Sequence, residues 1–373
     1  MLTKSRPFRR GAAALGALAL AATVAACGSS SKSASGTNGA SQGSSTANYP
    51  TVTLMVGGID KQIYLEYQLA QDLGFFKKYG VNMVLSTEQS GGVGAEDAMA
   101  SGQVDMAGAW YLHTIEFQTK GKPVEDVVNL GVAPGERIMC AKGTSFTSPA
   151  QWKGKNIGVT DLGSGTDNLV RYMAAKAGLK TSDFNRVGVG AGSTFVSALE
   201  NGRIACGMTS QPTVAAIEKL GVGYPAFDLS SAAGEEKWLG GTFPAAGVLA
   251  LTSWVNSHQA TVQKVVDAMV ATMHWISTHS ATDIANALPS SFVQNATITK
   301  AQYIAGLTTD KGQFLPDGIM PAGGPKVVYA MEKTIGVDTS KVTLSKTFTN
   351  QYAQAALKQL GLTATTTPAG ADG

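Results

Sequence analysis

The chain has 373 residues, of which 44% are hydrophobic and 15% charged, so it is long enough for two folded domains with sizeable cores. Its formal net charge of +3 is misleading, because Lys4, Arg6, Arg9 and Arg10 supply four positive charges where no acidic residue lies. Subtracting those four from +3 leaves −1 for residues 28–373, which contain no basic run. This balance argues against nucleic acid as a partner.

The N-terminus has the pattern of an export signal. Basic residues precede an apolar, alanine-rich run over residues 11–26 that is too short to span a bilayer. The sequence Val24-Ala25-Ala26-Cys27 resembles the cleavage box of bacterial lipoproteins. This resemblance implies cleavage before Cys27, lipidation of Cys27 with acyl chains such as palmitate, and anchoring at the extracytoplasmic face of the cell membrane. The alternative is a soluble secretory signal with an incidental cysteine.

Two segments of biased composition flank the expected folded body. Residues 28–48 are almost all Ser, Gly, Ala, Thr and Asn, which predicts a flexible tether after the signal peptide of residues 1–27. Residues 363–373 are predicted to be a disordered tail.

Strands and helices alternate along the first part of the body, which predicts an α/β fold with a mostly parallel sheet. The loops at the carboxyl ends of these strands are residues 57–60, residues 90–92 and Trp110-Tyr111. The strands are expected at residues 51–56, 81–85, 104–109 and 127–132, and the helices at 64–73, 95–100 and 112–119.

A second, similar lobe follows. A strand at residues 156–159 leads through the loop 163–166 into a helix that ends at Gly178. Residues 198–208 echo residues 98–108, each being a helix end, a glycine turn and an apolar strand. We therefore predict lobe one from residues 49–135 plus 245–362, lobe two from residues 136–244, and a cleft between them. A 3.6-residue apolar stripe predicts a long helix that supports lobe one, through Val262, Val265, Val266, Met269, Val270, Met273 and Ile276.

The ligand site is expected at the carboxyl ends of the strands, where open α/β sheets bind their ligands. Free N–H groups at the helix starts would hold the polar end of a solute, although Ser164 or Thr166 could simply cap its own helix. His113 either packs structurally or touches the ligand. The candidates in lobe one are Gly58, Asp60, Ser90, Gly91, Gly92, Trp110, Tyr111 and His113; those in lobe two are Ser164, Gly165, Thr166, Asp167, Ser193, Ser210 and Gln211.

Several kinds of chemistry lack their sequence patterns. The four histidines are scattered, and no metal-binding spacing occurs. The glycine-rich segment 188–193 fails the dinucleotide fingerprint, and neither a phosphate-binding loop nor a nucleophile elbow is found. We therefore expect no cofactor, no metal and no enzymatic activity. Cys140 and Cys206 could form a disulfide or remain two buried thiols.

Four segments together resemble the solute-binding proteins of nitrate/sulfonate/taurine-type ABC importers: residues 73–81, 152–158, 158–166 and 188–202. The similarity covers roughly residues 50–280. It implies a type II periplasmic-binding-protein fold, with two lobes joined by two crossovers. It also implies a membrane permease and a separate ATPase as partners of a monomer. In that fold the strands of Cys140 and Cys206 are neighbours, which favours the disulfide.

Acidic residues near the expected cleft complicate the choice of solute. Asp60, Glu88, Glu136 and Asp167 would repel an anion, although Asp167 could serve only its helix dipole. A sulfonate-, nitrate- or taurine-like solute and an amine-bearing, zwitterionic or heterocyclic solute therefore both stay open. The expected function is capture of a small organic solute for an ABC importer. An exported enzyme or a solute sensor using the same cleft is the alternative.

Overall fold

The computed structural model describes residues 48–88, 92–371 and 373, and Ala47–Gly373 forms a compact unit by itself. The expected export signal, Cys27 and the tether up to residue 47 lie outside the described residues. So do Ser90 and Gly91 of the expected ligand site. Within the described ranges, no helix combines the length and the apolar character that a membrane crossing needs.

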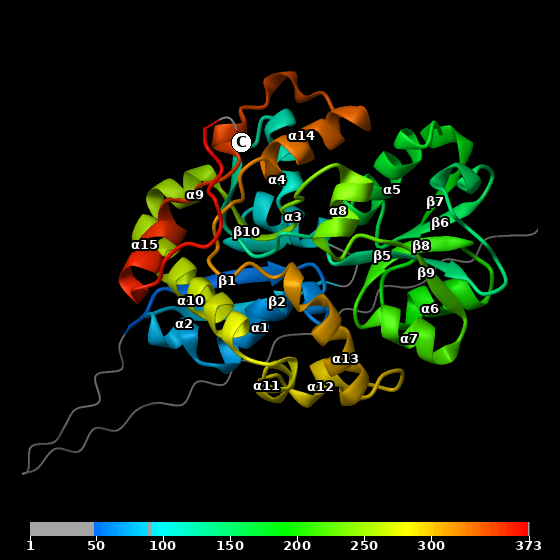
Figure 1. The fold of residues 1–373 in the computed structure, drawn as a ribbon. Helices are drawn as coiled ribbons and strands as arrows, with labels where there is room; N and C mark the ends of the chain where they lie inside the picture. The colour runs from blue at the N-terminus through cyan, green and yellow to red at the C-terminus, as the bar shows by residue number, and fades with distance from the viewer. Residues whose placement is uncertain (1–47, 89–91, 372) are drawn as a thin grey trace, which may run out of the picture. The chain divides into compact units, whose positions relative to one another are not determined.

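Five strands form the first sheet, in the order β2-β1-β3-β10-β4; Figure 1 labels β1, β2 and β10. β1 is parallel to β2 and β3, whereas β10 is antiparallel to both β3 and β4. The bounds of the strands are β1 Thr51–Val56, β2 Asn82–Thr87, β3 Met106–Trp110, β4 Val124–Asn129 and β10 Ala246–Leu251.

The second sheet repeats this plan in the order β7-β6-β8-β5-β9. β6 is parallel to β7 and β8, and β5 is antiparallel to β8 and β9. Each sheet thus has one inner strand, β10 in the first and β5 in the second, that is antiparallel to the other four. The prediction of two α/β lobes with mostly parallel sheets is confirmed. The bounds are β5 Glu136–Ala141, β6 Asn156–Val159, β7 Asn185–Gly188, β8 Cys206–Ser210 and β9 Gly223–Asp228.

Helices connect the parallel strands in each lobe. In the first lobe they are the short η1 Gln62–Tyr64, α1 Leu65–Asp72, α2 Phe75–Lys78, α3 Val93–Ala100 and α4 Leu112–Thr119. In the second they are α5 Gly165–Lys176, α6 Ser193–Glu200, α7 Thr213–Leu220 and α8 Ala232–Leu239. α5 begins where the Ser164 side chain accepts the N–H of Asp167, a standard N-cap.

The remaining helices follow β10. They are α9 Thr252–Ser257, α10 Gln259–Thr278, α11 Ala281–Ala287, α12 Ser290–Val293, α13 Lys300–Asp310, α14 Gly324–Thr334 and α15 Gln351–Leu360. The predicted stripe of α10 is fully buried and packs beside α1, α2, α15 and β4 (Figure 1). Its methionines, Met269 and Met273, belong to the hydrophobic core, as expected.

Helix α13 ties the two lobes together. Tyr303 and Leu307 share one apolar cluster with Leu65 of α1 and with helices α6 and α7. At its C-terminus, Asp310 accepts two hydrogen bonds from Arg137 of β5, at 2.7 and 2.6 Å. This buried ion pair joins segments that lie 173 residues apart in the chain.

The C-terminal segment differs from the expected disordered tail. The N–H groups of Thr365 and Thr366 donate to the Asp317 carboxylate at 2.8 and 2.7 Å, and that of Ala369 donates to the Met320 carbonyl at 2.8 Å. The Asp317 side chain is buried, so its charge requires such donors. Polar composition alone does not reveal this partner, which is why the prediction is wrong for residues 363–371.

The two cysteines of the folded body are bonded to each other. Cys140 of β5 lies opposite Cys206 of β8 in the antiparallel register, and their sulfur atoms are joined. Of the two alternatives that the sequence left open, the structure therefore contains the disulfide.

Candidate functional site

Strand ends from both lobes meet around one small cavity, which we name the central cavity. It holds about 260 Å³ of space between protein atoms, part of it open to solvent. Residues that end or follow β1, β3 and β6 line it, which is where α/β sheets bind ligands. The lining residues are Lys61, Ile63, Tyr64, Glu96, Trp110, His113, Glu136, Thr160, Gly165 and Thr166.

Trp110 and Gly165 bring the lobes into contact at this cavity. A Cβ atom placed on Gly165 would lie 2.2 Å from Cε3 of the Trp110 indole, so only glycine allows this approach. The same indole packs edge-on against Phe243, with ring centroids 6.2 Å apart. The first turn of α5 is therefore covered by an aromatic ring of the other lobe.

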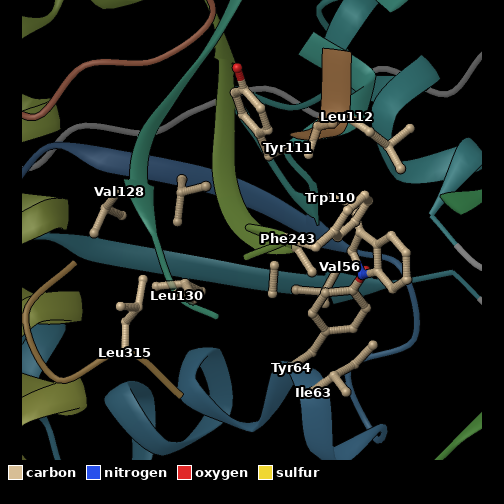
Figure 2. Close-up of a cluster of buried hydrophobic side chains, with 14 of the residues drawn as sticks. Val56, Ile63, Tyr64, Trp110, Tyr111, Leu112, Val128, Leu130, Phe243 and Leu315 are labelled. Carbon is tan, nitrogen blue, oxygen red and sulfur yellow. The ribbon is translucent and has the colours of Figure 1, made fainter. Parts of the chain in front are cut away.

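Trp110 and Tyr111 diverge, although the sequence suggested that both would cover a ligand. Figure 2 shows Trp110 beside Tyr64, while Tyr111 extends away from them. The Tyr111 hydroxyl lies 2.6 Å from Oγ1 of Thr347. β3 ends at Trp110, and the backbone of Tyr111 already has the helical dihedral angles of the start of α4, so the two side chains leave the chain in different directions. The structure brings Trp110, and not Tyr111, to the site.

The hydroxyl groups before and within the first turn of α5 bond to one another. Oγ1 of Thr160 lies 3.0 Å from Oγ of Ser164 and 2.9 Å from Oγ1 of Thr166, and the last two atoms are 2.9 Å apart. Thr166 also accepts the backbone N–H of Thr160. These predicted ligand contacts are thus part of a closed local network.

Asp167 faces away from the central cavity. Its carboxylate accepts the N–H of Gly163 at 2.9 Å and pairs with the Arg186 guanidinium. A carboxylate at this position complements the dipole of α5, the alternative role that the sequence allowed. At the start of α3 a different acid takes the corresponding place, because the Gly92 N–H donates to Oε1 of Glu88.

Lys61 and Glu136 form one charged side of the cavity. Lys61 Nζ donates to the Gly57 carbonyl at 2.8 Å. Burial lowers the pKa of Lys61, although Glu136 opposes this shift. Burial raises the pKa of Glu136 to about 8, against the effects of Lys61, Arg137 and a hydrogen bond from Ser210. Oε2 of Glu136 has no hydrogen-bond partner among the described residues.

His113 stands between two carboxylates. Its Nε2 lies 3.2 Å from Oε1 of Glu96, and its Nδ1 lies 2.9 Å from Oε2 of Glu116. Burial lowers the pKa of His113, but Glu96 and Glu116 outweigh burial and raise it to about 9. Burial also raises the pKa of Glu96 to about 8, with His113 acting against it. Oε1 of Glu96 makes no hydrogen bond of good geometry within the described part of the chain, so its contact with His113 is purely ionic.

The other predicted residues lie outside the central cavity. Gly58 and Asp60 line a neighbouring outer pocket, with about 500 Å³ of space between protein atoms that includes open solvent. The other lining residues are Lys61, Ala191, Gly192, Pro212, Thr213, Ala216, Asn295 and Thr297. Ser193 is exposed and lines a separate groove with Ser197 and Asn201. The Gln211 side chain accepts the N–H of Ala215 at 3.1 Å. Ser210 reaches the cavity only through its bond to Glu136.

Sequence reasoning missed five cavity residues: Lys61, Ile63, Tyr64, Glu96 and Thr160. Lys61 and Tyr64 directly follow the predicted strand-end turn 57–60, and Glu96 lies in the first turn of the helix after the predicted loop 90–92. A wider window after each strand end would have included all of them. What the sequence could not show is which side chains of that window turn inward.

The central cavity combines charged and aromatic groups. It offers two buried carboxyls, two basic side chains and two aromatic rings, drawn from both lobes. In the ranges that the structure describes, no group of three or more His, Cys, Asp or Glu side chains could hold a metal ion.

Comparison with known proteins places these features in a family. Residues 64–281, more than half of the chain, match the family model described as NMT1/THI5 like. A comparison with curated protein sequences gives no significant match. A solved structure of a protein from Bordetella bronchiseptica RB50 is 30% identical in sequence to this chain, with a TM-score of 0.78. The match covers 83% of this chain and 98% of that one.

More distant solved structures share the fold. One is described as a putative periplasmic sulfonate-binding protein of an ABC transporter from Methylobacillus flagellatus KT; it is 18% identical, with a TM-score of 0.62, and the match covers 86% of this chain and 97% of that one. Another is the periplasmic nitrate-binding protein of Synechocystis PCC 6803; it is 14% identical, with a TM-score of 0.63, and the coverage is 84% and 89%. The two-lobed fold of periplasmic binding proteins, expected from the sequence, is confirmed.

Proposed function

Because the chain belongs to the NMT1/THI5-like family, we propose that it is an extracytoplasmic solute-binding protein of an ABC importer. It captures a small organic solute and delivers it to a membrane permease driven by a separate ATPase. The observation that carries this proposal is the central cavity, whose lining comes from the strand ends of both lobes. A solute there would contact both lobes at once and so stabilise their closed arrangement.

The contacts across the cleft support a closing motion. Trp110 of the first lobe covers Gly165 of the second, and Asn168 of α5 donates to Glu116 of α4 at 2.9 Å and to Glu332 of α14 at 3.0 Å. A solute enters the cavity when these contacts separate and is enclosed when they form again. Hinge closure of two lobes around a ligand is a common transport and sensing motion, and the ligand favours the state that it contacts best.

The N-terminal sequence supports export and anchoring. We propose that Cys27 is lipidated after cleavage of residues 1–26, so that the folded body works as a monomer on the outer face of the cell membrane. We propose two candidate solute classes: sulfonate-, nitrate- or taurine-like anions, and amine-bearing or heterocyclic compounds.

Native mass spectrometry of Ala47–Gly373, purified without refolding, tests the proposal. A co-purified small molecule of defined mass, recovered chemically unchanged, is the expected result. An empty protein would next be screened with sulfonates, amines and pyrimidines for a rise in melting temperature, because a ligand of the folded state must stabilise it. The proposal fails if no solute is found and no compound raises the melting temperature.

A further inference from the structure

Among the described residues, the starts of α3 and α5 beside the central cavity already contact groups of the protein itself. The N-terminus of α3 binds the carboxylate of Glu88 through the N–H of Gly92. The first turn of α5 is filled by the hydroxyls of Ser164 and Thr166 and covered by Trp110. Helix N-termini attract anions through their free N–H groups and the helix dipole. A sulfonate or nitrate would therefore have to displace groups that the protein itself supplies.

The cavity wall also presents carboxyl groups. Glu96 and Glu136 are 4% and 2% exposed, and both line the cavity. Oε2 of Glu136 has no hydrogen-bond partner among the described residues, and Oε1 of Glu96 has only the ionic contact with His113. A buried carboxylate oxygen without a donor is unfavourable, so a ligand that brings N–H donors would relieve it.

The basic groups nearby do not cancel these acids. His113 is shared between Glu96 and Glu116, and Lys61 directs its ammonium to the Gly57 carbonyl. The acids at and behind the wall are Glu96, Glu116, Glu136 and, at the start of α3, Glu88. The bases are Lys61 and His113; Arg137, which also acts on Glu136, is paired with Asp310. A positive charge placed here would stabilise the ionised forms of Glu96 and Glu136, whose pKa values burial raises to about 8, whereas a negative charge would gain nothing from either carboxyl.

We propose that the central cavity selects a solute whose buried end is a positively charged nitrogen group, an amine or an amidine, held by Glu96 and Glu136. Tyr64 and Trp110 line the same cavity as these carboxyls, and their rings would present aromatic surfaces to the same group or to the carbon skeleton next to it. The inference rests on the proposed binding function. It narrows the solute class and separates this chain from the nitrate-binding and sulfonate-binding proteins whose fold it shares.

Two matched panels of probes test the inference by isothermal titration calorimetry on Ala47–Gly373. The cationic panel is benzamidine, benzylamine and agmatine; the anionic panel is benzenesulfonate, butanesulfonate and nitrate. We expect at least one cation to bind and no anion to bind. The variants Glu96→Gln and Glu136→Gln should each weaken cation binding by about 10- to 100-fold, because each replaces a charge-assisted hydrogen bond by a neutral one.

Glu66→Gln is the matched control. Glu66 is another fully buried carboxyl without hydrogen-bond partners among the described residues, but it does not line the central cavity. This variant should leave cation binding unchanged. The melting temperature of each ligand-free variant checks folding, and the selectivity of the unmodified protein decides the question even if one variant fails to fold.

The outcomes separate the two proposals. If anions bind and cations do not, or if cations bind equally well to both glutamine variants, the charge selectivity is wrong while the binding function stands. If neither panel binds and native mass spectrometry finds no other solute, both proposals fail.

Discussion

The buried ion pair between Arg137 and Asp310 should be a major determinant of stability. The two guanidinium nitrogens reach the two carboxylate oxygens at 2.7 and 2.6 Å, and both side chains are almost completely buried. Replacing Arg137 by Met keeps most of the side-chain volume and leaves Asp310 buried without its partner. Removing one partner of such a pair costs about 3–5 kcal/mol, so we expect a loss of that size.

Asp228 provides the contrast. It lies 3.3 Å from Nε of the same arginine, but its side chain is 50% exposed. Solvent screens this contact, so Asp228→Asn should cost about 1 kcal/mol or less. The double variant Arg137→Met/Asp310→Asn should lose less than the sum of its single variants, because no charged group then remains buried alone.

Urea unfolding of Ala47–Gly373, followed by circular dichroism, measures these differences as shifts of the midpoint at constant slope. If Arg137→Met loses no more stability than Asp228→Asn, the ion pair does not hold α13 to the second lobe. A double variant as unstable as the sum of the single variants would likewise show that the two side chains act independently.

Three further perturbations test other parts of the structure. Gly165→Ala places a Cβ 2.2 Å from Trp110, so it should prevent full closure of the lobes and weaken solute binding at least tenfold. Small-angle scattering measures the closure and calorimetry the binding. The control is Gly312→Ala, whose Cβ would meet no atom within 4 Å and which should change neither closure nor binding. Replacing both Cys140 and Cys206 by Ala removes a cross-link between residues that are 66 positions apart in the chain. On the chain-entropy model this should lower the free energy of unfolding by about 4 kcal/mol. An unchanged urea midpoint would show that the disulfide contributes little to stability. The ligand-free protein should lose stability as the pH rises from about 5 to about 9. The pKa values of Glu96 and Glu136 are raised to about 8 and that of His113 to about 9. The folded state therefore binds more protons than the unfolded state over this range, and the free energy of unfolding falls as the pH rises. A melting temperature that rises steadily over the same range would contradict this sign.

The sequence could predict most of the secondary structure and several of the strand-end residues that line the central cavity. The buried stripe of α10, the alternation of strands and helices, and the echo between residues 98–108 and 198–208 all depend on local periodicity, which a chain carries in its own order. The rule that α/β sheets bind ligands at their strand ends then pointed to Trp110 and Gly165, both of which line the central cavity.

The sequence alone thus determined that the chain forms two α/β lobes whose strand ends carry the candidate site, because hydrophobic period and turn residues are local properties. Only the tertiary structure decided which groups at those ends remain available to a ligand. Hydrogen bonding satisfies Ser164 and Thr166 within the protein, Tyr111 turns to Thr347, and Asp317 holds a tail that composition predicted to be disordered. Glu96 and Glu136, in contrast, are carried into the cavity wall. Their hydrogen-bond partners and their burial depend on residues far away in the chain, so no local sequence pattern predicts them.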